Sequence, residues 1–102
     1  MDWVKLAKKN YHALNLRFMW SKPVDRRFDW KGTYTRRVHL WADWRLYIPI
    51  SRLTDAGWID LKDKTIHIES DAPGAAEKLQ EVYDYLKELD ICMQEYLSSD
   101  TN

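Results

Sequence analysis

Residues 73–97 carry the longest regular pattern in this sequence. Large apolar side chains recur there at spacings of three and four, which places them on one face of a helix: Leu79, Val82, Leu86, Leu89, Met93 and Tyr96. Acidic residues and lysines occupy much of the remaining helix surface. The pattern therefore predicts one long helix, and its apolar face requires an apolar surface that packs against it.

Two surfaces could cover this helix. Its seam could pair with a second chain as a coiled coil, which would mean self-association through the C-terminal helix. However, residues beside the seam widen the apolar stripe, as in a helix that faces a core: Tyr83, Tyr85, Cys92 and Leu97. We therefore predict that the helix lies on the chain's own sheet, with Cys92 as a buried, unreactive thiol. Asp90 falls inside the stripe, where we expect a cation from the N-terminal half beside it. Ile91 falls nearly opposite, where we expect it exposed on a surface for self-association or a partner.

The length of 102 residues suits one domain, and we predict a single α+β domain over residues 1–102. One cysteine cannot form an internal disulfide, so the framework of a small secreted protein is absent. No apolar run has the length of a signal peptide or a membrane helix. We expect a cytoplasmic protein that does not enter a membrane.

Charge is divided unevenly along the chain. Residues 1–52 hold 12 Lys or Arg and 4 Asp or Glu, whereas residues 53–102 hold 4 and 12, so the halves carry +8 and −8. This asymmetry indicates either a basic and an acidic surface on one domain or two halves that neutralise each other on packing. The sequence leaves both interpretations open.

The first half begins with a helical pattern. Asp2 can cap a helix over residues 3–14, whose lysines lie on its outer side. Alternating apolar residues then predict a strand over 16–20, and residues 23–32 have no period and predict a loop.

Strand-forming residues dominate the middle of the chain. The composition predicts strands over 33–41 and 44–50, joined by a turn at 42–43. Pro49 lacks an N–H group, so the second strand should lie at a sheet edge or end near that residue. Residues 51–57 could form one helical turn that Gly57 ends.

A hairpin follows this predicted turn. Its two strands, 58–62 and 65–69, alternate apolar and polar residues around a two-residue loop at 63–64. This register places Asp60 opposite His67 and Trp58 opposite Glu69. Together the elements predict an α+β fold, with an antiparallel sheet of about four to five strands flanked by an N-terminal helix and a long C-terminal helix.

The residues that carry chemistry form no known catalytic or metal-binding motif. The three histidines and Cys92 lack the spacing of metal ligands, and the three glycines stand too far apart for a phosphate-binding loop. Asp60 and His67 are the one acid–base pair that the predicted register brings together. We therefore predict no enzyme, no catalytic residues, no metal and no cofactor, with a hydrolase that uses Asp60 and His67 as the third hypothesis.

Basic and aromatic residues gather between residues 26 and 37. Arginine contacts carboxylates and phosphates, aromatic rings stack, and both residue types dominate protein hot spots. We predict that this cluster is the main partner-binding surface, unless its arginines pair internally and only hold the domain together. The cluster comprises Arg26, Arg27, Trp30, Tyr34, Arg36 and Arg37.

Residues 51–59 and 65–68 resemble the end of the recognition helix and the wing of winged-helix DNA-binding domains. The matching residues run from Ser51 to Ile59 and from Thr65 to Ile68. The resemblance implies nucleic-acid binding. Upstream the chain departs from that family, because strand patterns and Pro49 replace the two preceding helices.

Taken together, these patterns predict a small non-enzymatic interaction protein. We expect its partner to be another protein, in the manner of accessory proteins or inhibitors that phages and mobile elements encode. The alternative is a nucleic-acid-binding domain, winged-helix-like or otherwise, that uses the basic half.

Overall fold

A computed structural model describes residues 2–23 and 33–100, with side chains up to residue 94. The helices are α1 (Trp3–Lys9), α2 (Tyr11–Phe18) and α3 (Ala75–Asp100). The strands are β1 (Trp20–Pro23), β2 (Thr33–Arg36), β3 (His39–Trp41), β4 (Arg45–Pro49), β5 (Asp55–Asp60) and β6 (Thr65–Ile68). The predicted α+β class is confirmed, but the strands form two antiparallel sheets, one of two strands and one of four, where one sheet was predicted.

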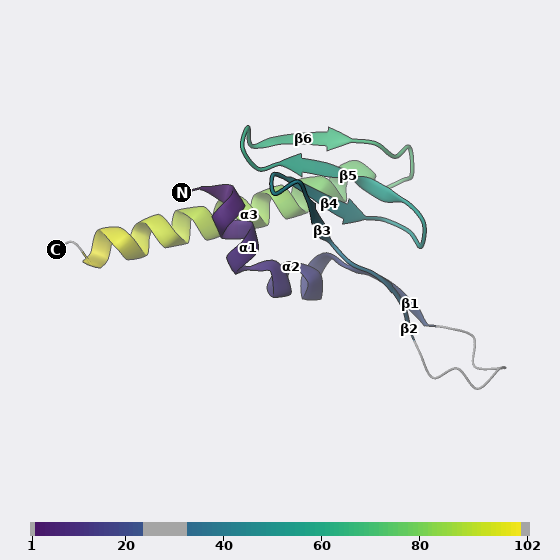
Figure 1. Cartoon of the computed structure of the whole chain (residues 1–102), viewed down its shortest axis with the longest axis horizontal. Coiled ribbons are helices and arrows are strands. Elements are labelled where there is room, and N and C mark those ends of the chain that lie inside the picture. The colour runs from purple at the N-terminus through teal and green to yellow at the C-terminus, as the bar shows by residue number, and fades with distance from the viewer. Residues whose placement is uncertain (1, 24–32, 101–102) are drawn as a thin grey trace.

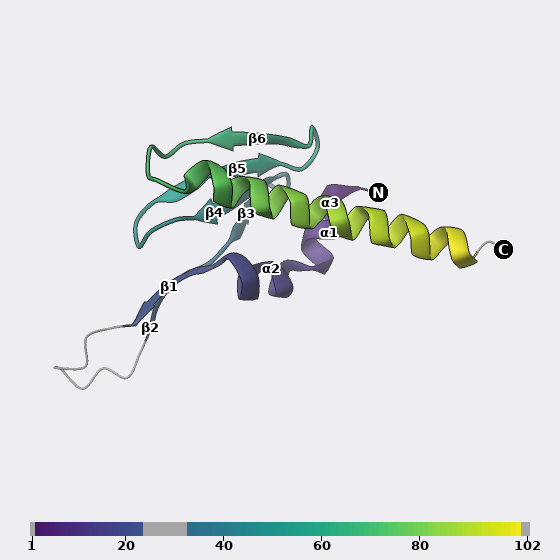
Figure 2. The same cartoon turned by 180° about the vertical axis from the view of Figure 1, so that it is seen from behind.

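The four-stranded sheet runs in the order β3-β4-β5-β6, and α3 crosses one of its faces (Figures 1 and 2). Each strand pairs with the strand that precedes it in the chain, as short turns favour. Leu46 lies opposite Ile59, and both are fully buried on the face that α3 covers. Residues alternate between the two faces of a strand, so the neighbouring Tyr47 and Trp58 lie on the other face.

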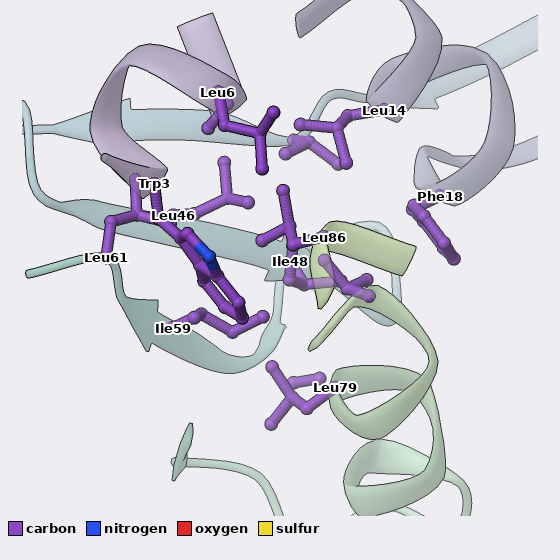
Figure 3. Packing of buried hydrophobic residues seen from close by; sticks show 14 of the residues in the cluster. Trp3, Leu6, Leu14, Phe18, Leu46, Ile48, Ile59, Leu61, Leu79 and Leu86 are labelled. Atoms are coloured by element: carbon purple, nitrogen blue, oxygen red, sulfur yellow. The ribbon is translucent and has the colours of Figure 1, made fainter. Parts of the chain in front are cut away.

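The core forms where α3 meets this sheet, and Figure 3 shows its packing. Leu79, Val82 and Leu86 of α3 are fully buried at helical spacing, and Leu89 packs partly against the same cluster. Burial of each such side chain contributes about 1.5–3 kcal/mol relative to exposure. The prediction that this helix lies on its own sheet is confirmed.

The predictions for Ile91, opposite the stripe, and Cys92, beside it, had different outcomes. Ile91 is exposed, as predicted, with 47% of its surface accessible. Cys92 is also exposed, so its predicted burial is wrong. Cys92 instead lines an open hollow at the surface, between α3 and the end of α1.

The N-terminal segment forms two helices where we predicted one helix and a strand. The backbone leaves helical geometry at Asn10, whose side chain donates to the carbonyl of Leu6 at 2.8 Å. The strand predicted over 16–20 is wrong because α2 extends to Phe18. Leu14 and Phe18 are buried at a helical spacing of four, whereas Leu16, which supported the strand, is 65% exposed.

The strand predicted over 33–41 is interrupted at Arg37 and Val38. Residues before this point form β2 in the two-stranded sheet, and residues after it form β3 in the larger sheet. The turn at 42–43 is confirmed, with positive φ at Ala42 and Asp43. Pro49 is the last residue of β4, next to an irregularity in the register, which agrees with its predicted place at a strand end.

The helical turn predicted over 51–57 is wrong. Residues 51–53 form a bend, and β5 begins at Asp55. Gly57 lies inside this strand instead of ending a helix. A Cβ atom on Gly57 would lie 2.0 Å from the backbone oxygen of His67, so close strand approach requires glycine there. The implied recognition helix of a winged-helix domain is therefore absent from this segment.

The predicted hairpin exists as β5 and β6, but its predicted register is wrong. Trp58 lies opposite His67, and Asp60 lies opposite Thr65. A loop of four residues joins the strands, and Oδ1 of Asp60 accepts hydrogen bonds from two of its backbone N–H groups. The acid–base pair that the predicted register implied is not formed, because Asp60 is engaged by this turn.

Asp90 lies near the end of the apolar stripe, where Trp3 and Lys64 face it. The indole Nε1 of Trp3 donates to the carboxylate at 3.0 Å, and Nζ of Lys64 lies 4.0 Å away. The hydrogen bond from Trp3 lowers the pKa of Asp90 below its ordinary value, and the charge of Lys64 adds to this effect. This bond joins α1 to α3 across the sequence.

The two-stranded sheet extends away from the body, at the opposite end from the C-terminal turns of α3 (Figure 1). The hairpin of β1 and β2 therefore projects from the four-stranded sheet at one end, and the C-terminal turns of α3 project at the other (Figure 1). The orientation of the hairpin depends on the residues at its base.

Candidate partner-binding groove

The base of the hairpin is fixed at Val38, where the chain passes from β2 to β3. Val38 is fully buried, and both of its backbone polar groups are bound by α2. Its N–H donates to Oδ1 of Asn15 at 2.8 Å, and its carbonyl accepts from the hydroxyl of Tyr11 at 2.6 Å. Asn15 is itself only 3% exposed, so this junction is shielded from water.

A second attachment joins the hairpin to the larger sheet through Arg36. Its guanidinium lies 3.1 Å from Oδ2 of Asp55, and another of its nitrogens lies 3.5 Å from the carbonyl oxygen of Arg52. The Asp55 side chain is only 13% exposed, so water screens this ion pair poorly. Arg36 therefore holds β2 against the beginning of β5.

An open groove of about 660 Å³ lies between the hairpin and the bend at residues 51–54. We call it the hairpin groove. One wall is the hairpin and the other is the bend. Its lining residues are Trp20, Lys22, Pro23, Tyr34, Ser51, Arg52, Leu53 and Thr54. Its volume falls within the range of ligand pockets, about 300–1,000 Å³.

The strand register determines which hairpin residues face this groove. Trp20 lies opposite Arg36 and Lys22 lies opposite Tyr34, so alternation places all four on one face of the hairpin. The rings of Trp20 and Tyr34 meet edge-on, with centroids 6.3 Å apart. Tyr34 remains 40% exposed.

The opposite wall is a tight bend closed by its own hydrogen bonds. The N–H of Thr54 donates to the hydroxyl of Ser51 at 3.1 Å, and the carbonyl of Thr54 accepts from the N–H of Ile50 at 2.9 Å. This closure leaves Arg52 and Leu53 at the tip. The Arg52 guanidinium lies 4.7 Å from the centre of the Tyr34 ring, a cation–π contact across the groove, and Leu53 is 78% exposed.

The structure distributes the predicted cluster among different roles. Tyr34 lines the hairpin groove, Arg36 forms the internal ion pair, and Arg37 is exposed at the junction outside the groove. Arg26, Arg27 and Trp30 lie outside the described residues. The alternative prediction was that the arginines of the cluster form internal ion pairs. Among the described residues of the cluster, Arg36 forms such a pair, with Asp55.

Of the eight residues that line the groove, the predicted cluster contains only Tyr34. The strand predicted over 16–20 includes Trp20 but ends before Lys22, so the face that these two residues share is not recognised. Arg52 and Leu53 were assigned to a helical turn. The sequence held one signal for an exposed site here: Leu53 is a large apolar residue between two polar neighbours.

A second aromatic surface lies on the face of the four-stranded sheet turned away from α3. One ring from each strand forms a row across the sheet: His39, Tyr47, Trp58 and His67. His39 and Tyr47 stack with centroids 5.0 Å apart, and Trp58 and His67 stack at 3.8 Å. These ring faces cover one another, so they offer little free surface on which a nucleic-acid base could stack.

Arg45 occupies the adjacent position on the same sheet face. Its guanidinium lies 4.0 Å from the ring centre of Trp58 and 5.5 Å from that of Trp41. Trp41 is 55% exposed, whereas Trp58 donates its indole N–H to Glu69 at 3.0 Å. Most side chains on this sheet face therefore contact one another.

Neither a metal site nor a membrane-spanning helix is found among the described residues. Residues 2–23 and 33–100 contain no group of three or more His, Cys, Asp or Glu side chains arranged to hold a metal ion. Over the same ranges, no helix combines the length and apolar character needed to span a bilayer.

No protein-family model matches the chain, and comparisons with curated proteins and with solved structures gave no significant match.

Proposed function

We propose that this chain is a small non-enzymatic interaction protein that binds another protein through the hairpin groove. It would act in the cytoplasm as an accessory protein or inhibitor, of the kind that a phage or another mobile element encodes. The sequence predicts a binding surface at residues 26–37. We propose instead that the partner binds in the groove between Tyr34 and the bend at residues 51–54.

The observation that carries this proposal is the exposure of large apolar and aromatic side chains around a concave surface. Leu53 is 78% exposed and Tyr34 is 40% exposed, on opposite walls of the groove. Tyr, Trp and Arg are the residue types most enriched at binding hot spots, and the groove contains one of each. Its walls are held by buried contacts at Val38 and Asp55, so little ordering would be needed on binding.

The test is protein capture from a lysate treated with nuclease, using wild type and Leu53→Glu. We expect the wild type to retain specific protein bands and Leu53→Glu to lose them. Because Leu53 is so exposed, its substitution should change the free energy of unfolding by no more than about 0.5 kcal/mol. Loss of binding would then reflect the surface and not the fold.

Leu16→Glu is the matched control for this experiment. Leu16 is an exposed leucine on α2 that does not line the groove, with 65% of its surface accessible. The Leu16→Glu variant should capture the same protein bands as the wild type. Equal capture by wild type and Leu53→Glu, with both folded, would contradict the hairpin groove as the binding site.

Nucleic-acid binding is the second candidate, because Lys22 and Arg52 give the groove a positive charge. In that case nuclease would remove the captured material. Affinity would also fall linearly on a plot of log affinity against log salt concentration, with a slope that reflects released counterions.

A further inference from the structure

The charged residues that line the hairpin groove are Lys22 and Arg52, and both are cations. Within the described part of the chain, neither forms an ion pair. The carboxylate of Asp55, at the end of the bend, is already paired with the guanidinium of Arg36, whose Nη2 lies 3.1 Å from its Oδ2. Among the described residues, the groove therefore carries positive charge without an acidic partner.

Arg52 is positioned to bind an anion with little loss of side-chain freedom. Its guanidinium rests 4.7 Å from the centre of the Tyr34 ring, and its backbone carbonyl is contacted by Arg36. A planar guanidinium held in this way can present two parallel N–H donors to a carboxylate. Because the groove is open, a carboxylate can reach Arg52 directly from solvent.

The remaining groove surface favours a peptide over a nucleic acid. Trp20, Pro23, Tyr34 and Leu53 provide an apolar surface next to the two cations. Nucleic-acid interfaces are strongly positive and contact several phosphates in succession, whereas protein interfaces combine an apolar centre with a few charges. Two cations beside four apolar side chains correspond to the second arrangement.

We infer that the hairpin groove binds an acidic segment of the partner protein, in which a carboxylate meets Arg52 and a neighbouring large apolar side chain packs between Tyr34 and Leu53. This inference rests on the proposed function, since it names the chemistry of the partner at the same site. It specifies an acidic residue and a large apolar residue of the partner that reach the groove together.

The probe is a synthetic peptide that alternates Glu with Leu and Phe, compared with a peptide in which every Glu is replaced by Gln. Binding is followed by NMR through the indole N–H signal of Trp20, which Trp20→Phe identifies. The acidic peptide should shift this signal and bind at least about tenfold more tightly than the Gln peptide, as loss of one charge-assisted contact implies. The indole signal of Trp58, outside the groove, should not move.

Two arginine variants assign the charge. Arg52→Gln should weaken binding of the acidic peptide about tenfold. Arg17→Gln is the matched control, because Arg17 makes a comparable cation–π contact, 5.0 Å from the ring centre of Tyr85, away from the groove. It should leave peptide affinity unchanged.

The outcomes separate the inference from the function on which it rests. If both peptides bind equally, or neither binds, while Leu53-dependent protein capture persists, the acidic partner is wrong and the proposed function stands. If a single-stranded oligonucleotide displaces the peptide and binds more tightly in an Arg52-dependent manner, the groove is a nucleic-acid site and both are overturned. If capture does not depend on Leu53 and no peptide shifts Trp20, both fail together.

Discussion

Substitution of Asn15 by Ala tests whether the junction at Val38 fixes the hairpin. Asn15 is 3% exposed, and its Oδ1 accepts the buried N–H of Val38 at 2.8 Å. Its Nδ2 also donates to the carbonyl of Tyr11 at 3.3 Å. The variant leaves the Val38 N–H without an acceptor, which costs about 1–3 kcal/mol. Alanine regains about 0.5 kcal/mol through its higher helix propensity in α2.

The expected net loss is therefore about 0.5–2.5 kcal/mol in the free energy of unfolding. It is measured by urea denaturation followed by tryptophan fluorescence, and each kcal/mol should also lower the thermal midpoint by about 4–8 °C. Leu16→Ala, at the next and exposed position of α2, is the control and should change stability by less than about 0.5 kcal/mol. If Asn15→Ala is as stable as this control, Asn15 does not hold the junction, and the reasoning about a fixed groove wall fails.

Three further variants test the core, the sheet and the contact between α1 and α3. Leu86→Ala should cost about 2–5 kcal/mol in denaturant unfolding, because Leu86 is fully buried; a loss under about 0.5 kcal/mol would contradict the packing of α3. Gly57→Ala should destabilise by at least about 1–3 kcal/mol, since its Cβ would meet the His67 backbone, and near-wild-type stability would refute that close approach. The lowered pKa of Asp90 contributes stability above about pH 4, its unfolded value, which is lost as the pH falls through the folded pKa. The stability difference between wild type and Asp90→Asn should therefore shrink on acidification below that value, and a constant difference would argue against the bond from Trp3.

The long helix was predictable because its signal repeats over many turns. Leu79, Val82 and Leu86 define the same face three times, so a local error in the pattern does not change the prediction. The end of α2, which the prediction assigned to a strand over 16–20, was missed for the opposite reason. It is short, and the exposed Leu16 between buried Leu14 and Phe18 produces an apparent alternation of two.

The hairpin of β5 and β6 shows what a period-two pattern cannot determine. The predicted pairing of Asp60 with His67 and the observed pairing with Thr65 differ by two residues, so both place the same side chains on the same faces. Only the turn distinguishes them. Asp60 caps the backbone of the four-residue loop, and Lys64 adopts a φ of +58°, features that alternation does not encode.

The groove could not be found along the sequence because its walls are distant in the chain. Trp20 and Tyr34 meet Arg52 only because the chain crosses between two sheets at Val38, and no periodicity predicts such a crossing. The predicted cluster shares Tyr34 with the groove, but its neighbours in sequence gave no information about the opposite wall.

Arg36 and Arg52 show why arginine content alone does not locate a binding surface. Arg36 lies 3.1 Å from a largely buried carboxylate, and removal of either partner would leave a charge without compensation. Arg52 contacts an exposed aromatic ring and faces an open groove, so its charge is available to a partner. The same residue type therefore stabilises the hairpin in one position and is free to bind in the other. Only the acidic residue opposite Arg36, contributed by the start of β5, distinguishes the two roles.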